Sequence, residues 1–130
     1  MGNSSLQFNN CYEALMKMIQ LSADLSLELE KKEKTGKKEN EQKIRNIEND
    51  FLIIKHSLCD MGIYDECMKF VTMSEEMDEL LVDNEQEKDP QRKDALCVRI
   101  DGLEYKILEI KHHIDKIPFK RSYNNFINLD

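Results

Sequence analysis

The side chains of this chain that could do chemistry are three histidines, four cysteines and many carboxylates. His112 and His113 are adjacent, so on a helix they point about 100° apart and cannot chelate one metal ion together. His113 can pair with Glu109 one turn earlier, as a solvated ion pair near a helix C-terminus, where the helix dipole also favours histidine. We therefore predict no metal site and no bound cofactor.

The cysteines form no C-x-x-C pair and stand among apolar residues of predicted helices: Cys11, Cys59, Cys67 and Cys97. This pattern is typical of reduced thiols that pack as small hydrophobic side chains in a cytoplasmic, reducing compartment. The sequence also has no glycine-rich phosphate loop, no nucleophile elbow and no H-E-x-x-H motif. Because no set of titratable groups converges on a recognisable reaction, we predict that the protein is not an enzyme.

An acidic segment spans residues 75–89 and contains eight acidic side chains and one lysine. Its net charge of −7 equals the net charge of the whole chain. It is either a solvated helix face or a docking surface for a basic partner, where complementary charge speeds association. As a docking surface it would make its contacts through Asp83, Glu85 and Glu87. The negative charge argues against nucleic-acid binding, which relies on lysine and arginine to neutralise phosphates.

Apolar residues at alternating steps of four and three predict the helices that position these groups. The longest stripe predicts a helix of about seven turns, with Asp89 as N-cap, Pro90 at the first helical position and Pro118 as the stop. Its members are Leu96, Ile100, Leu103, Ile107, Ile110, Ile114 and Ile117. A second stripe, which Gly62 ends, consists of Ile44, Ile47, Phe51, Ile54, Leu58 and Met61. We assign these two stripes to the core.

Two further helices are predicted, from about residue 6 to 34 and from about residue 64 to 87. The inward residues of the first are Phe8, Cys11, Leu15, Met18, Leu25 and Leu29, and those of the other are Cys67, Phe70, Met73, Met77 and Leu80. Short connections make neighbouring helices antiparallel. We therefore predict an all-α fold, an antiparallel bundle of three to four long amphipathic helices over residues 1–118, with a short tail at 119–130.

The tail carries aromatic side chains on a polar background, and two interpretations stay open. It folds back over the end of the bundle, or it binds another protein with Tyr123 and Phe126 as an anchor pair. At the other end Gly2 follows Met1, but Leu6 stands where a myristoylation signal prefers serine or threonine, so we expect no lipid anchor. The longest aliphatic and aromatic run, residues 51–54, is far too short for an integral membrane segment.

Two short strings resemble the contact helices of a known module: Met77-Asp78-Glu79-Leu80 and Arg92-Lys93-Asp94-Ala95-Leu96. Over about residues 41–115 the chain is similar to a BAG domain, the helical co-chaperone module that binds the ATPase domain of heat-shock chaperones. The resemblance implies that Asp78 is the acidic contact to the chaperone and that Arg92 or Lys93 is the basic one. Met68 and Asp101 depart from the family pattern, which has an acidic residue and a glutamine at these places.

Taken together, these patterns predict a non-enzymatic helical module that binds other proteins, as an adaptor, assembly subunit or co-chaperone. The resemblance implies one alternative, a nucleotide-exchange cofactor of a heat-shock chaperone. The other alternative is a structural coiled-coil oligomer, in which one long stripe continues into a second copy of the chain. Both a monomer and a homodimer are compatible with the pattern.

Overall fold

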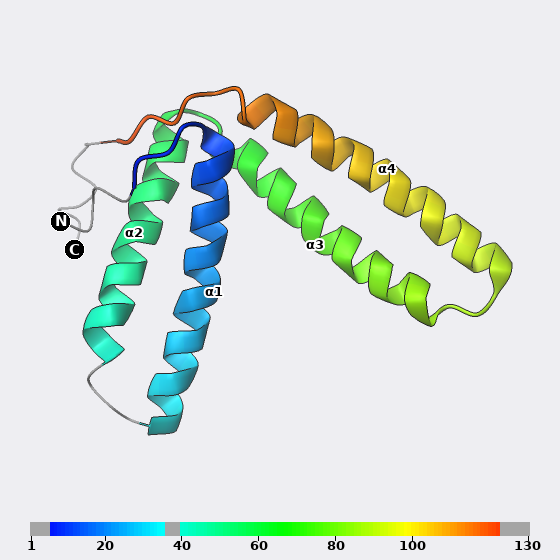
Figure 1. Ribbon diagram of the computed structural model, residues 1–130, viewed down its shortest axis with the longest axis horizontal. Helices are drawn as coiled ribbons and strands as arrows, with labels where there is room; N and C mark the ends of the chain where they lie inside the picture. Colours follow the sequence, from blue (N-terminus) through cyan, green and yellow to red (C-terminus); the bar gives the residue numbers. More distant parts are fainter. Residues whose placement is uncertain (1–5, 36–39, 123–130) are drawn as a thin grey trace. The chain divides into compact units, whose positions relative to one another are not determined.

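The computed structural model describes residues 6–35 and 40–122, and within them the chain forms four α-helices and no strand (Figure 1). The helices are α1 (Cys11–Thr35), α2 (Asn40–Asp60), α3 (Tyr64–Gln86) and α4 (Pro90–Ile114). The predicted all-α fold is confirmed. Two compact units are present: the α1–α2 unit, from the described residues of Met1–Tyr64 and Asp115–Asp130, and the α3–α4 hairpin, Asp65–Ile114.

Helix α1 begins later than predicted, at Cys11 instead of near residue 6, because Asn10 caps it. The Asn10 side-chain oxygen accepts the backbone N–H of Glu13 at 2.9 Å, which satisfies one of the free N–H groups of the first turn. The Glu13 carboxylate in turn accepts the backbone N–H of Asn9 at 3.1 Å. The residues before Cys11 are therefore held as a cap and not as a further turn of helix.

Helix α2 ends at Asp60, and the predicted stop, Gly62, follows it in the left-handed conformation, with φ of 76°. The Gly62 N–H bonds to the Cys59 carbonyl at 3.0 Å, and the Ile63 N–H bonds to the Leu58 carbonyl at 3.1 Å. These two bonds form a Schellman motif, which satisfies carbonyl groups left free at a helix end. A side chain at position 62 would be strained in this conformation, so glycine is needed here.

Helix α4 begins as predicted, since the Asp89 carboxylate accepts the backbone N–H of Gln91 at 3.3 Å. Its predicted end is wrong by one turn, because the helix stops at Ile114 and Ile117 lies outside it. Pro118 disfavours helical dihedral angles at Ile117, and the Ile117 carbonyl accepts the backbone N–H of Cys11 at 2.9 Å. That bond ties the segment after α4 to the first turn of α1.

In the α1–α2 unit the two helices lie side by side and antiparallel (Figure 1). The buried apolar side chains are Leu6, Cys11, Ala14, Leu15, Met18, Leu21, Ile44, Ile47, Ile53, Ile54 and Leu58. Of the stripe predicted for α2, Phe51 is only half-buried, and Ile53 is buried on the neighbouring side. On α1 the buried row repeats every seven residues through Ala14, Leu21 and Glu28, so Leu29 is exposed.

In the hairpin α3 and α4 run antiparallel, as two cross-helix contacts show. Arg99 Nη2 lies 3.6 Å from Glu76 Oε2, and Lys93 Nζ donates to the Asn84 carbonyl at 2.9 Å. The predicted stripe of α4 divides into two rows at seven-residue spacing. One row is buried, Ile100, Ile107 and Ile114, and the other is only half-buried, Leu96, Leu103 and Ile110. A single neighbouring helix thus covers one side of the stripe better than the other.

The buried row of α4 predicts a sharp contrast between two adjacent aliphatic residues. We expect Ile107→Ala to lower the free energy of unfolding by about 2–5 kcal/mol, because Ile107 is 8% exposed. Leu108→Ala is the matched control, and should cost less than about 1 kcal/mol because Leu108 is 44% exposed. Urea unfolding followed by circular dichroism measures both, and equal losses would show that the buried row is misplaced.

Candidate functional site

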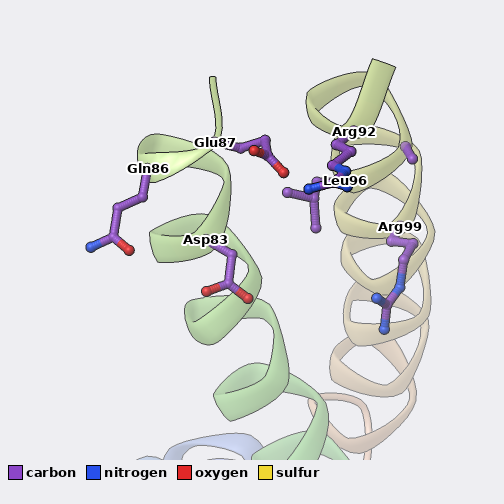
Figure 2. Close-up of a pocket in the computed structure, with 7 residues that line it drawn as sticks. Asp83, Gln86, Glu87, Arg92, Leu96 and Arg99 are labelled. Carbon is purple, nitrogen blue, oxygen red and sulfur yellow. The ribbon is translucent and has the colours of Figure 1, made fainter. Parts of the chain in front are cut away.

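An open cleft between α3 and α4 lies in the half of the hairpin that contains the α3–α4 connection (Figure 2). Its lining consists of Asp83, Gln86, Glu87, Arg92, Ala95, Leu96 and Arg99. In Figure 2 the side chain of Glu87, directly after α3, and that of Leu96 on α4 extend toward each other, whereas Gln86 points away. The cleft therefore has one wall from each helix and an apolar side chain between the walls.

The two walls of the cleft carry opposite charge. Asp83 stands on α3 and Glu87 directly follows its last residue, and Arg92 and Arg99 stand on α4. The arginines are seven residues apart, so they share one side of α4, and each lies one turn from Leu96. An apolar contact flanked by both signs of charge suits a protein surface with the complementary order of charges.

The arginines are bound only loosely within the hairpin. Arg92 Nε lies 3.7 Å from an Asp89 oxygen, and Arg99 pairs with Glu76 at 3.6 Å. The two arginine side chains are 77% and 62% exposed, and exposed ion pairs of this kind contribute little to stability. Both guanidinium groups are thus accessible to a partner at small cost in lost contacts.

The structure separates the residues that the sequence predicted as partner contacts. Asp83, Glu87 and Arg92 meet in the cleft, whereas Asp78 and Glu85 are exposed elsewhere on α3. Asp78 lies about two turns, roughly 10 Å, along the hairpin from the level of Arg92. Lys93 lies outside the lining of the cleft and donates to the Asn84 carbonyl.

Arg99 is the charged lining residue that the sequence reasoning missed. Its signal was present, because it repeats Arg92 after seven residues and borders the half-buried row of α4. The acid that faces it, Glu76, is known only once α3 and α4 are paired in register. Charge on a single helix therefore could not identify the cleft.

Tyr123 and Phe126, the predicted anchor pair of the tail, lie outside the described residues. The part of the tail that the structure describes belongs to the α1–α2 unit. The Phe119 and Phe8 rings meet edge to face, with centroids 5.3 Å apart. The Ser122 N–H donates to the buried Ser57 hydroxyl at 2.9 Å, and the Ser122 hydroxyl contacts the Asp60 carboxylate. Up to Ser122 the chain therefore folds back on this unit.

The groups that could act as nucleophiles or metal ligands include a buried cysteine, Cys11, and an exposed histidine, His113. Burial raises the pKa of the Cys11 thiol to about 11, so it is protonated at neutral pH. His113 contacts Glu66 across the hairpin, and not Glu109 as expected from the sequence. Within residues 6–35 and 40–122 no three histidine, cysteine or acidic side chains are placed to hold a metal ion.

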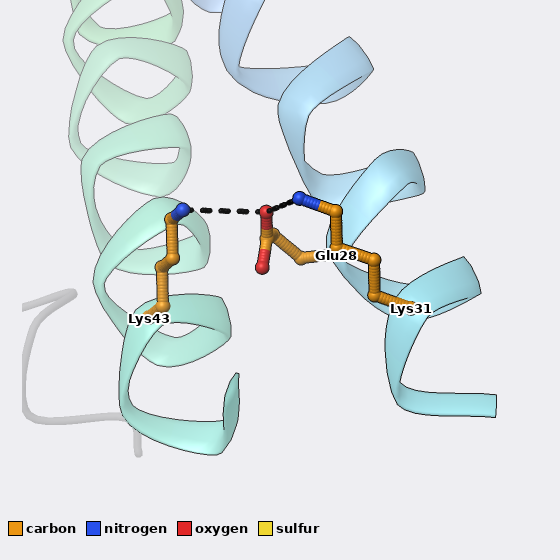
Figure 3. Close-up of polar contacts among 3 residues, drawn as sticks. All are labelled: Glu28, Lys31 and Lys43. Carbon is orange, nitrogen blue, oxygen red and sulfur yellow. Dashed lines mark hydrogen bonds and ion pairs between the residues drawn. The ribbon is translucent and has the colours of Figure 1, made fainter. Parts of the chain in front are cut away.

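A buried carboxylate, Glu28, lies in the α1–α2 unit on the side of α1 that faces α2 (Figure 3). One of its oxygens lies 3.3 Å from Lys43 Nζ and 3.4 Å from Lys31 Nζ. Desolvation raises the pKa of Glu28, but the hydrogen bonds and charges of Lys43 and Lys31 outweigh it, so the pKa lies below its ordinary value. In this cluster the ion pair of Glu28 with Lys43 links α1 to α2, and Lys31 adds a second positive charge from α1.

No helix in the described part of the chain is both long enough and apolar enough to cross a bilayer. Comparisons of this chain with models of protein families, with curated proteins and with solved structures find no match.

The Glu28 cluster predicts a pH-dependent contribution to stability. Because the pKa of Glu28 is lowered by folding, its carboxylate stabilises the fold above the ordinary glutamate pKa of about 4.3 and loses this effect as the pH falls below it. We expect wild type to melt at a higher temperature than Glu28→Gln at pH 7, with the gap closing in acid. A gap that survives protonation of the carboxyl group would contradict this account.

Proposed function

We propose that this chain is a non-enzymatic helical protein-interaction module, an adaptor or assembly subunit, which binds a basic partner through the α3–α4 hairpin. The observation that carries this proposal is the distribution of charge between the two units. The hairpin holds fourteen acidic and seven basic side chains, whereas the rest of the chain holds twelve of each. The whole net charge of −7 therefore lies on the hairpin.

An outer acidic face of α3 would meet this partner. It is formed by the exposed side chains of Glu75, Asp78, Glu79 and Glu85. Val82 lies among them and is 51% exposed, so the face also offers an apolar contact. Positions 75, 78, 82 and 85 follow the spacing of one helix side, which keeps these groups together. A basic amphipathic surface is the complementary partner, with association accelerated by the opposite charge.

A nucleotide-exchange cofactor of a heat-shock chaperone is a second candidate, which rests on the BAG-domain resemblance. The observation in its favour is that Asp78 and Arg92 are both exposed on adjacent antiparallel helices. Because Asp78 belongs to the outer acidic face and Arg92 to the cleft side, a chaperone ATPase domain would have to contact two sides of the hairpin.

Neutralising the outer acidic face should abolish binding of the basic partner. We expect affinity capture from a cell extract, read by mass spectrometry, to lose specific proteins with Asp78→Asn, Glu79→Gln and Glu85→Gln combined. The matched control is Glu30→Gln, Glu33→Gln and Glu48→Gln, which removes the same charge from exposed positions of α1 and α2. For a purified partner, association should slow by about tenfold or more as salt rises from about 0.05 to 0.5 M.

Two results separate the candidates. Binding that ignores salt and survives the Asp78, Glu79 and Glu85 changes would overturn the acidic docking surface. Acceleration of nucleotide release from a purified heat-shock chaperone ATPase domain, lost in Asp78→Ala with Arg92→Ala, would assign the co-chaperone role.

A further inference from the structure

The cleft side of the hairpin presents a partly covered apolar row beside a row of positive charge. The apolar row is Leu96, Leu103 and Ile110, which are half-buried. Arg92, Arg99 and Lys106 repeat every seven residues and lie one turn from these aliphatic side chains, so the two rows run along α4 together. An apolar row with this spacing is the pattern that a further helix covers in a bundle.

The facing wall, formed by α3 and by Glu87 directly after it, carries the opposite charge on the same side of the hairpin. Asp83 and Glu87 line the cleft, and Glu76 reaches Arg99 across it. This side is therefore divided lengthwise into an acidic half on α3 and a basic half on α4. The division differs from the outer acidic face, where the charges of Glu75, Asp78 and Glu85 all have one sign.

A surface divided in this way is complementary to itself. A two-fold axis parallel to the hairpin places α3 of one copy opposite α4 of the other, at the same level along the axis. Asp83 and Glu87 of each copy then face Arg92 and Arg99 of the other, and the Leu96 side chains meet near the axis. A uniformly basic segment would match only the α3 half and would be repelled by the two arginines.

The geometry points to a second copy of this chain as the occupant of the cleft side, with the two hairpins forming a four-helix contact. The net charge of −7 on each hairpin opposes this contact only weakly, because charges farther apart than about 8 Å are screened at physiological salt. The pairing is decided by the charges of the two walls, because these come within a few ångströms of the other copy. In the two-fold arrangement each acidic wall faces a basic wall. This interface uses a different side of the hairpin from the outer acidic face, so each can fail without the other.

Sedimentation equilibrium of the full chain tests the oligomeric state directly. We expect a mass of twice 15.4 kDa at tens of micromolar concentration. Arg92→Glu with Arg99→Glu makes both walls acidic, and should weaken self-association by about a hundredfold or more through like-charge contact. Asp83→Lys with Glu87→Lys makes both walls basic, and should weaken it to a similar extent.

Mixing the two variants makes the test specific. An acidic-walled chain and a basic-walled chain are complementary, so a one-to-one mixture should form the dimer that neither forms alone. Asp94→Lys with Asp101→Lys is the control, because these exposed positions are also seven residues apart but lie on another side of α4. It should dimerise as wild type does.

Three results would overturn the proposal. The first is a mass of 15.4 kDa for the wild-type protein at tens of micromolar concentration. The second is a dimer that persists with Arg92→Glu and Arg99→Glu. The third is a mixture of helical, folded variants that stays monomeric, with folding checked by circular dichroism.

Discussion

Burial of one apolar stripe against one antiparallel neighbour is the interaction on which both units of this protein depend. In the α1–α2 unit, further segments supplement the pair. Leu6 is fully buried before α1, and Phe119 packs on Phe8 after α4. In the hairpin the stripe of α4 is wider than one neighbour covers, so Ile100 and Ile107 are buried while Leu96 and Leu103 remain half-open. The two units therefore differ in how completely they bury their apolar surface.

The charge distribution follows the same division. Where a charge lies inside the α1–α2 unit, as with Glu28, two lysines surround it. The hairpin instead carries the surplus of negative charge, mostly on exposed side chains of α3. The surplus negative charge destabilises the hairpin slightly by self-repulsion, but it favours rapid association with a positively charged partner. This distribution is what we expect of a surface for binding, and the α1–α2 unit supplies the better-covered core.

Much of the fold could be predicted from the sequence because helix ends are decided locally. The Asp89-Pro90 start and the Gly62 stop depend on a few neighbouring residues, and both were predicted correctly. The phase of α1 was predicted only for its first half: Cys11, Leu15 and Met18 are buried as predicted, but farther along Leu21 and Glu28 are buried and Leu29 is exposed. Lys31 and Lys43 together offset the burial of this glutamate, and Lys43 approaches from another helix, which no local pattern reveals.

The candidate site was predictable only in part, for a related reason. Asp83, Glu87 and Arg92 were singled out from charge and from a family resemblance, without knowledge that they lie close together. Their meeting in one cleft, and the role of Arg99 beside Leu96, follow from the register between α3 and α4. Register depends on contacts between the two helices, such as that of Arg99 with Glu76, so a pattern read along one helix does not contain it.

If a second copy covers the half-open row of α4, then folding and association of the hairpin are linked by mass action. The most direct measurement is the midpoint of thermal unfolding, followed by circular dichroism over a wide range of protein concentration. We expect the midpoint to rise steadily with protein concentration, because the dimer stabilises the folded hairpin. A midpoint that does not change across that range would contradict this expectation.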